Sequence, residues 1–193
     1  MRGANRMKTP LFWLVAALGF LPLAAPAAGL APWEFGMSRK KVTSFKQFGP
    51  YQTFQNGDLE TNKGKFHGQK ENIQFFFKDG SLDRIGIYLF EGKDLKQSLP
   101  VWQKVFEQLQ KDYGKIDISN IRIKPEGDPL FPGILVPLAA ANMESTGETL
   151  VTPATQPKEM RVSAKYWKTN VQGDTYYFIA VFLDPPPNAK VKR

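Results

Sequence analysis

Residues 72–90 carry the clearest structural signal in the chain, and they read Asn-Ile-Gln-Phe-Phe-Phe-Lys-Asp-Gly-Ser-Leu-Asp-Arg-Ile-Gly-Ile-Tyr-Leu-Phe. Asp79-Gly80 favours a two-residue turn with positive φ, so the stretch predicts a β-hairpin of 72–78 with 81–90. Such a hairpin needs a partner for its apolar face, and the rest of the chain must therefore supply more strands and a covering layer.

The apolar pattern of this hairpin also predicts a β-bulge. An unbroken ladder from the turn would set Phe75 opposite Arg84, because a one-residue slip sends every side chain to the other face. One extra residue at Asp83–Arg84 restores Phe75 opposite Ile85. We therefore expect the bulge at Asp83–Arg84.

Two further strands are predicted near the C-terminus. Residues 160–168 alternate apolar with polar side chains, and 175–183 are apolar at nearly every position. Alternation indicates a strand with one buried face, and a continuous apolar run indicates a central strand. Pro185-Pro186-Pro187 then ends the sheet, and residues 185–193 form a basic tail.

Two helices are predicted to cover this sheet. Ser38 is a favourable N-cap and Gly49-Pro50 a stop signal, which predicts a helix over 39–48. Apolar residues at helical spacing predict a second helix over 99–113, with Ser98 as its cap. The fold class is therefore α+β, with two helices packed on one face of an antiparallel β-sheet. We expect ten core residues: Phe45, Phe48, Ile73, Phe75, Ile85, Ile87, Trp102, Phe106, Leu109 and Phe178.

Residues 115–158 change character, because they contain many prolines and a Thr-rich half. Isoleucines at its start allow a short strand, and 134–143 allow one short helix. Prolines remove hydrogen-bond donors, so we expect a long irregular excursion before the last hairpin, less protected than the sheet.

The first 27 residues resemble a secretory signal peptide. A basic start and a short apolar run precede Ala25-Pro26-Ala27, which fits an A-x-A cleavage site. We therefore expect residues 28–193 to form a single domain, periplasmic or secreted, with no stable membrane anchor. Loss of Arg2, Arg6 and Lys8 would reduce the net charge of +8 to +5. Outside the cytoplasm nucleic acid is not the expected partner.

Composition restricts the chemistry. The chain has no cysteine and one histidine, so disulfides, thiolate metal sites and multi-histidine sites are excluded. We expect no cofactor, no metal and no catalytic residue. His67 lies in a polar loop context, and Asp58 with Glu60 is the only carboxylate pair that acid–base hydrolysis would have.

The outward sheet face is the first candidate binding surface. Its residues are aromatic or basic, a combination that stacks rings and binds anions. They are Phe76, Arg84, Tyr88, Arg161, Lys165 and Trp167. The alternative is that the excursion folds across this face and buries the aromatic rings.

Arg39, Lys40 and Lys41 form the second candidate. Cations are unfavourable in a first helical turn, because the helix N-terminus already carries positive partial charge. Three in a row break that rule, which suggests an anion-binding site. The alternative is that the side chains extend into water.

Three segments resemble a known family. They are Trp33-Glu34-Phe35-Gly36-Met37-Ser38-Arg39-Lys40-Lys41-Val42, then Phe48-Gly49-Pro50, then Phe75-Phe76-Phe77-Lys78-Asp79-Gly80-Ser81-Leu82. These segments are similar to motifs of the small outer-membrane assembly lipoproteins of the SmpA/OmlA type and of β-lactamase-inhibitor-like domains. The resemblance spans about 34–91. It implies helices on an antiparallel sheet and a non-enzymatic, protein-binding role in the envelope. Those lipoproteins begin with an acylated cysteine, which this chain lacks.

Taken together, these observations predict an exported binding or accessory module for a protein or an anionic lipid or polymer of the bacterial envelope. A small secreted hydrolase acting on cell-wall or extracellular polymer is the alternative function.

Overall fold

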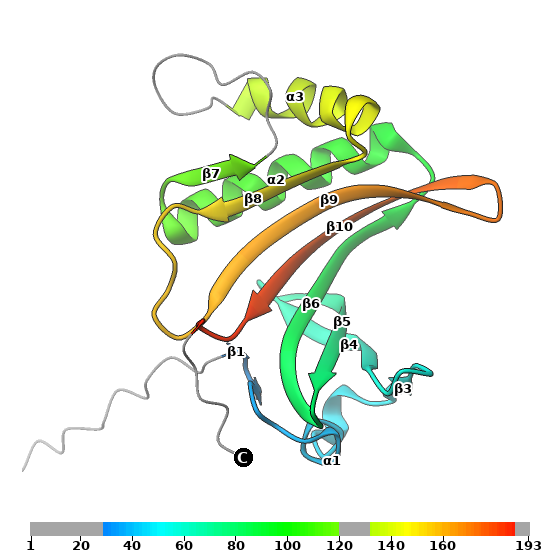
Figure 1. Ribbon diagram of the computed structural model, residues 1–193, viewed down its shortest axis with the longest axis vertical. Helices are drawn as coiled ribbons and strands as arrows, with labels where there is room; N and C mark the ends of the chain where they lie inside the picture. The colour runs from blue at the N-terminus through cyan, green and yellow to red at the C-terminus, as the bar shows by residue number, and fades with distance from the viewer. Residues whose placement is uncertain (1–28, 120–131, 188–193) are drawn as a thin grey trace, which may run out of the picture.

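One antiparallel sheet of eight strands organises the molecule (Figure 1). The computed structural model describes residues 29–119 and 132–187, so the expected signal peptide and most of the basic tail lie outside them. The strand order is β3-β4-β5-β6-β10-β9-β8-β7. The strands are β3 (Gln52–Thr53), β4 (Leu59–Phe66), β5 (Gln69–Lys78), β6 (Ser81–Gly92), β7 (Ile116–Ser119), β8 (Glu148–Pro153), β9 (Arg161–Val171) and β10 (Asp174–Asp184).

The sheet consists of two four-stranded meanders that meet at its centre. β3 to β6 run inward from one edge, and β7 to β10 run inward from the other. The last strand of each meander, β6 and β10, pair antiparallel. Each meander also follows a helical segment in the chain: α1 (Arg39–Val42) with η1 (Lys46–Phe48) before the first, and α2 (Leu95–Tyr113) before the second.

The predicted hairpin and its bulge are confirmed. Phe77 pairs with Leu82, whereas Phe76 pairs with Arg84, so Asp83 is the extra residue. Phe75 then pairs with Ile85, as the apolar pattern required. The turn residue Asp79 has φ 51° and Gly80 has φ 78°, the left-handed conformation that two-residue hairpin turns need.

The second predicted helix is confirmed but begins earlier. α2 starts at Leu95 because the Asp94 side chain accepts hydrogen bonds from the backbone N–H groups of Lys96 and Gln97. Ser98 is therefore inside the helix and buried. Its hydroxyl donates to the Leu95 carbonyl at 2.7 Å, and its oxygen accepts from the Tyr166 hydroxyl.

The expected helix over 39–48 is wrong. α1 stops at Val42 because the hydroxyls of Thr43 and Ser44 donate to the carbonyls of Lys40 and Lys41, a local alternative to helical bonding. The two-helix α+β architecture is therefore wrong as well. The described fold is mainly β, with α2 as the long helix against the sheet and a small two-stranded sheet of β1 (Gly29–Leu30) and β2 (Trp33–Glu34).

The irregular excursion is also corrected. Residues 116–119 and 148–153 pair as β7 and β8 and extend the main sheet. Between them, α3 (Pro132–Ser145) packs on α2 and β8, and Figure 1 shows it lying beside α2. The Asn142 amide donates to the Thr149 hydroxyl, and both residues are buried, so α3 is joined to β8 by a polar bond.

The core lies between the sheet and α2, and it continues to the N-terminal segment. Seven of the ten expected core residues are buried: Ile73, Phe75, Ile85, Ile87, Trp102, Phe106 and Leu109. Phe45 and Phe48 pack against the core but are only partly buried. Trp33 was not expected there. It is fully buried, with its ring 4.8 Å from that of Phe75. Phe178 lies on the opposite face of the sheet.

Candidate functional site

The face of the sheet that α2 does not cover carries a continuous group of aromatic rings. Strand register places them together, because residues paired across strands share a face. Gly86 pairs with Phe182, and Phe178 pairs with Trp167. We call this group the aromatic face. Its rings come from β5, β6, β9 and β10: Phe76, Tyr88, Trp167, Tyr176, Phe178 and Phe182.

The rings contact one another at short range. The centroids of Trp167 and Phe178 are 5.2 Å apart and the rings are nearly parallel, at 15°. Tyr88 meets the edges of Trp167 and Phe182, with centroids at 6.1 and 6.4 Å. All of these side chains are half-buried. Trp167 and Phe178 turn their ring faces toward each other, so part of the exposed apolar surface here is ring edge.

Gly86 gives this group of rings its space. A Cβ atom at this buried position would lie 3.1 Å from the Phe76 ring and 3.2 Å from the rings of Tyr88 and Phe182. The absence of a side chain therefore lets three rings from three strands close over one point of the backbone. Gly86 therefore has a packing role in the aromatic face.

Three cations at the border of the aromatic face are each paired with a carboxylate. The pairs Arg84–Asp184, Lys165–Glu148 and Lys93–Asp174 each have a nitrogen–oxygen distance of 2.6 Å. The same three cations lie over the rings of Phe182, Trp167 and Tyr176, at 5.3, 5.8 and 5.1 Å from the centroids. These three charges are therefore neutralised locally, which weakens their part of the border as an anion-binding surface.

The pKa of Tyr88, in the middle of these rings, is shifted by its surroundings. Burial raises the pKa of its phenol, and Glu91 and Glu60 raise it further, whereas Arg84 opposes them. A phenol in this setting keeps its proton at neutral pH and remains a hydrogen-bond donor. The aromatic face therefore carries a neutral tyrosine.

Most of the predicted face residues do come together, and others were missed. Phe76, Arg84, Tyr88, Lys165 and Trp167 belong to the aromatic face or its border. Arg161 is exposed at the end of β9. Its backbone partner on β10 is Asp184, whose carboxylate forms its ion pair with Arg84.

The sequence analysis did not place Phe178, Phe182 and Tyr176 on this face. The apolar run 175–183 shows no alternation that would assign each ring to one side of the sheet. The described part of the excursion does not cover these rings: β7 and β8 extend the sheet, and α3 packs on α2.

Arg39, Lys40 and Lys41 form most of α1, a helix of only four residues. The Arg39 guanidinium donates to the Gly57 carbonyl at 2.5 Å and lies over the Phe77 ring. Lys41 lies over the ring of Phe45 instead. Arg39 therefore has a structural role. A four-residue helix offers few free N–H groups and a small dipole, so the argument for an anion site at its N-terminus is weakened.

Asp58 and Glu60, the carboxylate pair considered for hydrolysis, make separate hydrogen bonds with different partners. Asp58 accepts hydrogen bonds from the Phe77 backbone N–H at 2.9 Å and the Asn56 amide at 2.7 Å, so it anchors the turn before β4. Glu60 accepts from Asn72 on the neighbouring strand. Within the described residues, no group of three His, Asp or Glu side chains is placed to hold a metal ion.

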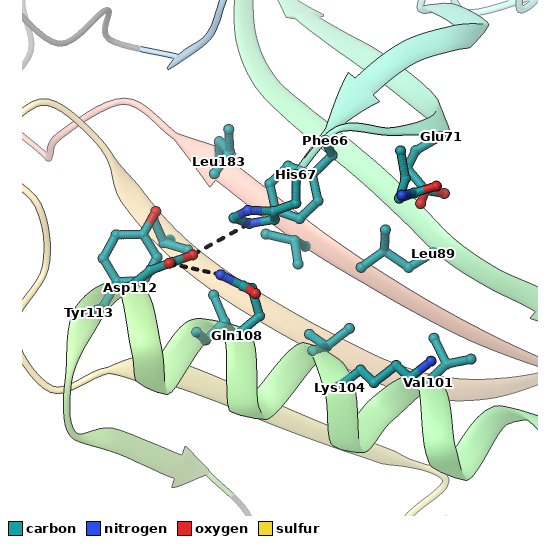
Figure 2. Close-up of a pocket in the computed structure, with 15 residues that line it drawn as sticks. Phe66, His67, Glu71, Leu89, Val101, Lys104, Gln108, Asp112, Tyr113 and Leu183 are labelled. Atoms are coloured by element: carbon teal, nitrogen blue, oxygen red, sulfur yellow. Dashed lines mark hydrogen bonds and ion pairs between the residues drawn. The ribbon is translucent and has the colours of Figure 1, made fainter.

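A pocket of about 280 Å³ lies between α2 and the inner face of the sheet (Figure 2). The tip of the β4–β5 hairpin closes one end, where His67 Nε2 lies 3.4 Å from the Asp112 carboxylate. The sequence had placed His67 only in a polar loop. Apolar side chains form most of the lining: Phe66, Leu89, Val101, Val105, Leu109, Val162, Val181 and Leu183.

No protein-family model, curated protein or solved structure matches the chain. Among the described residues, no helix is long and apolar enough to cross a membrane.

Proposed function

We propose that this protein is a non-enzymatic binding module that acts outside the cytoplasm and holds a protein partner against its aromatic face. The observation that carries the proposal is the group of six rings from four strands on the sheet face opposite α2. Aromatic residues and arginine are enriched in the centres of protein–protein interfaces. The export component rests on the N-terminal sequence.

The charges favour a protein over an anionic lipid or polymer. Three cations border the rings, and each already has a carboxylate at 2.6 Å. A polyanion would have to displace those carboxylates, whereas a protein surface with an apolar centre can leave the pairs intact at the rim. We therefore expect binding that changes little with ionic strength.

Photo-crosslinking tests this function directly. A benzophenone amino acid at Phe178 samples the aromatic face, and the same group at Glu107, exposed on α2, is the control. We expect a discrete protein adduct from position 178 in the envelope fraction of its own cell, competed by excess unlabelled protein. Equal labelling from position 107, or salt-sensitive adsorption to phosphatidylglycerol vesicles instead, would contradict the proposal.

Two variants then connect the adduct to the rings. Trp167→Ala removes a central ring and should weaken binding by about 2 kcal/mol, the scale of an interface hot spot. Gly86→Val should displace three rings at once and lower the adduct yield similarly. Phe54→Ala is the matched control, because Phe54 is 41% exposed outside this face. Denaturation curves establish that each variant is folded.

The hydrolase alternative gains no support from the geometry. Asp58 is occupied by two hydrogen bonds, and neither Asp58 nor Glu60 lines the pocket under α2.

A further inference from the structure

The pocket between α2 and the sheet is separate from the aromatic face, and its shape suggests a second ligand. One of its lining residues, Leu89, lies at a β-bulge. Ala180 pairs with Tyr88 and Ile179 pairs with Phe90, so Leu89 is the extra residue of β6. Val162, Val181 and Leu183 form the sheet side, and Val105 and Leu109 form the helix side. The pocket is therefore lined by the helix on one side and by strands of the sheet on the other.

Its volume sets the size of an occupant. An apolar cavity of about 150 Å³ accepts benzene, so a space of about 280 Å³ suits an apolar body of about ten carbon atoms. Natural small-molecule sites have a similar lining, mostly apolar with a few polar groups that orient the ligand.

The polar side chains that line the pocket differ in whether they have an ion-pair or hydrogen-bond partner. Asp112 is paired with His67 and accepts from the Gln108 amide at 2.8 Å. Lys104 is exposed and therefore hydrated, and the Tyr113 ring is half-buried. Glu71 is the exception: the residue is half-buried, and its carboxylate has no ion pair or hydrogen bond with any described side chain or backbone N–H. Figure 2 shows it near the end away from the His67–Asp112 pair.

We propose that this pocket binds a small amphiphilic amine, with its apolar chain between α2 and the sheet and its ammonium group on the Glu71 carboxylate. A carboxylate at the edge of an apolar pocket can accept a charge-assisted hydrogen bond from an ammonium group, and such a bond is stronger than one between neutral groups. Burial raises the pKa of Glu71, so binding of a cation would favour the ionised carboxylate and lower that pKa.

Methyl NMR with n-octylamine as the probe tests the site. We expect saturable shifts at Leu89, Leu109 and Leu183, which line the pocket, and none at Leu59 or Leu82, which are buried outside it. Glu71→Gln should weaken octylamine about tenfold or more, the scale of a lost charged hydrogen bond. Glu107→Gln makes the same change on the exposed side of α2 and should leave the affinity unchanged.

n-Octanol and octanoate distinguish the role of the charge. Octanol should bind more weakly than octylamine and be almost indifferent to Glu71→Gln. Tighter binding of octanoate would assign the head group to Lys104 and overturn the proposal. Equal shifts at Leu59 and Leu82 would show detergent-like binding, and absence of saturable shifts would show that no such ligand binds; either result also overturns it.

Discussion

At the scale of single residues, Trp102 carries much of the packing between α2 and the sheet. It is fully buried, with its ring 5.6 Å from that of Tyr166. Trp102→Ala should therefore leave a cavity and lower the free energy of unfolding by about 3–5 kcal/mol. Urea denaturation measures this.

Trp102→Phe is the control for that substitution. The Trp102 indole N–H has no hydrogen-bond partner in the structure, so phenylalanine loses volume but no hydrogen bond. Its cost should be clearly smaller than that of alanine. A loss under about 1 kcal/mol for Trp102→Ala, as at an ordinary surface site, would contradict this packing.

Tyr166 makes the stability depend on pH in the alkaline range. It is fully buried, and burial raises the pKa of its phenol. Above pH about 10 the unfolded chain loses this proton first, so unfolding is favoured increasingly as pH rises from there toward the folded pKa. Below pH about 10 the effect is absent.

Tyr166→Phe isolates that effect from the other tyrosines. The variant lacks the hydrogen bond to Ser98 and should be less stable at neutral pH by about 1 kcal/mol. It should also lose less stability than the unmodified protein between pH 9 and 11 in urea denaturation. Parallel pH profiles would show that the Tyr166 phenol ionises as readily in the folded protein as in the unfolded chain.

At the scale of elements, β8 shows how a polar segment can become an interior strand. It lies between β7 and β9, and Thr149 and Val151 are buried on its inner face. We expect the β8 amides that bond to β9 to exchange slowly with solvent, because they open only with the sheet.

The two-residue edge strand β3 provides the comparison for β8. Its residues Gln52 and Thr53 are exposed, so its amides should exchange much faster. Hydrogen exchange measured by NMR tests both strands in one experiment. Exchange in β8 as fast as in β3 would mean that the segment is not held in the sheet.

At the scale of the whole molecule, the pairing of β6 with β10 joins the two meanders into one core. Ile87 lies in β6 at this junction and is fully buried. Ile87→Ala should lower the free energy of unfolding by about 2–5 kcal/mol and affect both halves together. Fluorotryptophan NMR can follow Trp33 in the first half and Trp102 in the second. Separate midpoints for the two signals would show that the halves unfold independently.

Local pattern predicted the features that depend on neighbours in the chain. The Asp79-Gly80 turn and the apolar pairs around Asp83 sufficed for the hairpin and its bulge, because a period of two allows only one register to bury Phe75 with Ile85. The apolar stripe similarly predicted α2, although capping by Asp94 moved its start. The end of α1 was missed, because Thr43 and Ser44 compete for the helical carbonyls.

The aromatic face and the pocket depend on tertiary contacts that local sequence patterns do not contain. The residues 175–183 are apolar on both sides, so pairing with β6 and β9, not sequence periodicity, assigned Phe178 to the aromatic face and Ile179 to the core. The pocket likewise depends on a contact between His67 and Asp112, which are far apart in the chain. Composition and spacing report the conformational preference of short segments. Contacts between distant residues form only once the strands have paired in the folded chain.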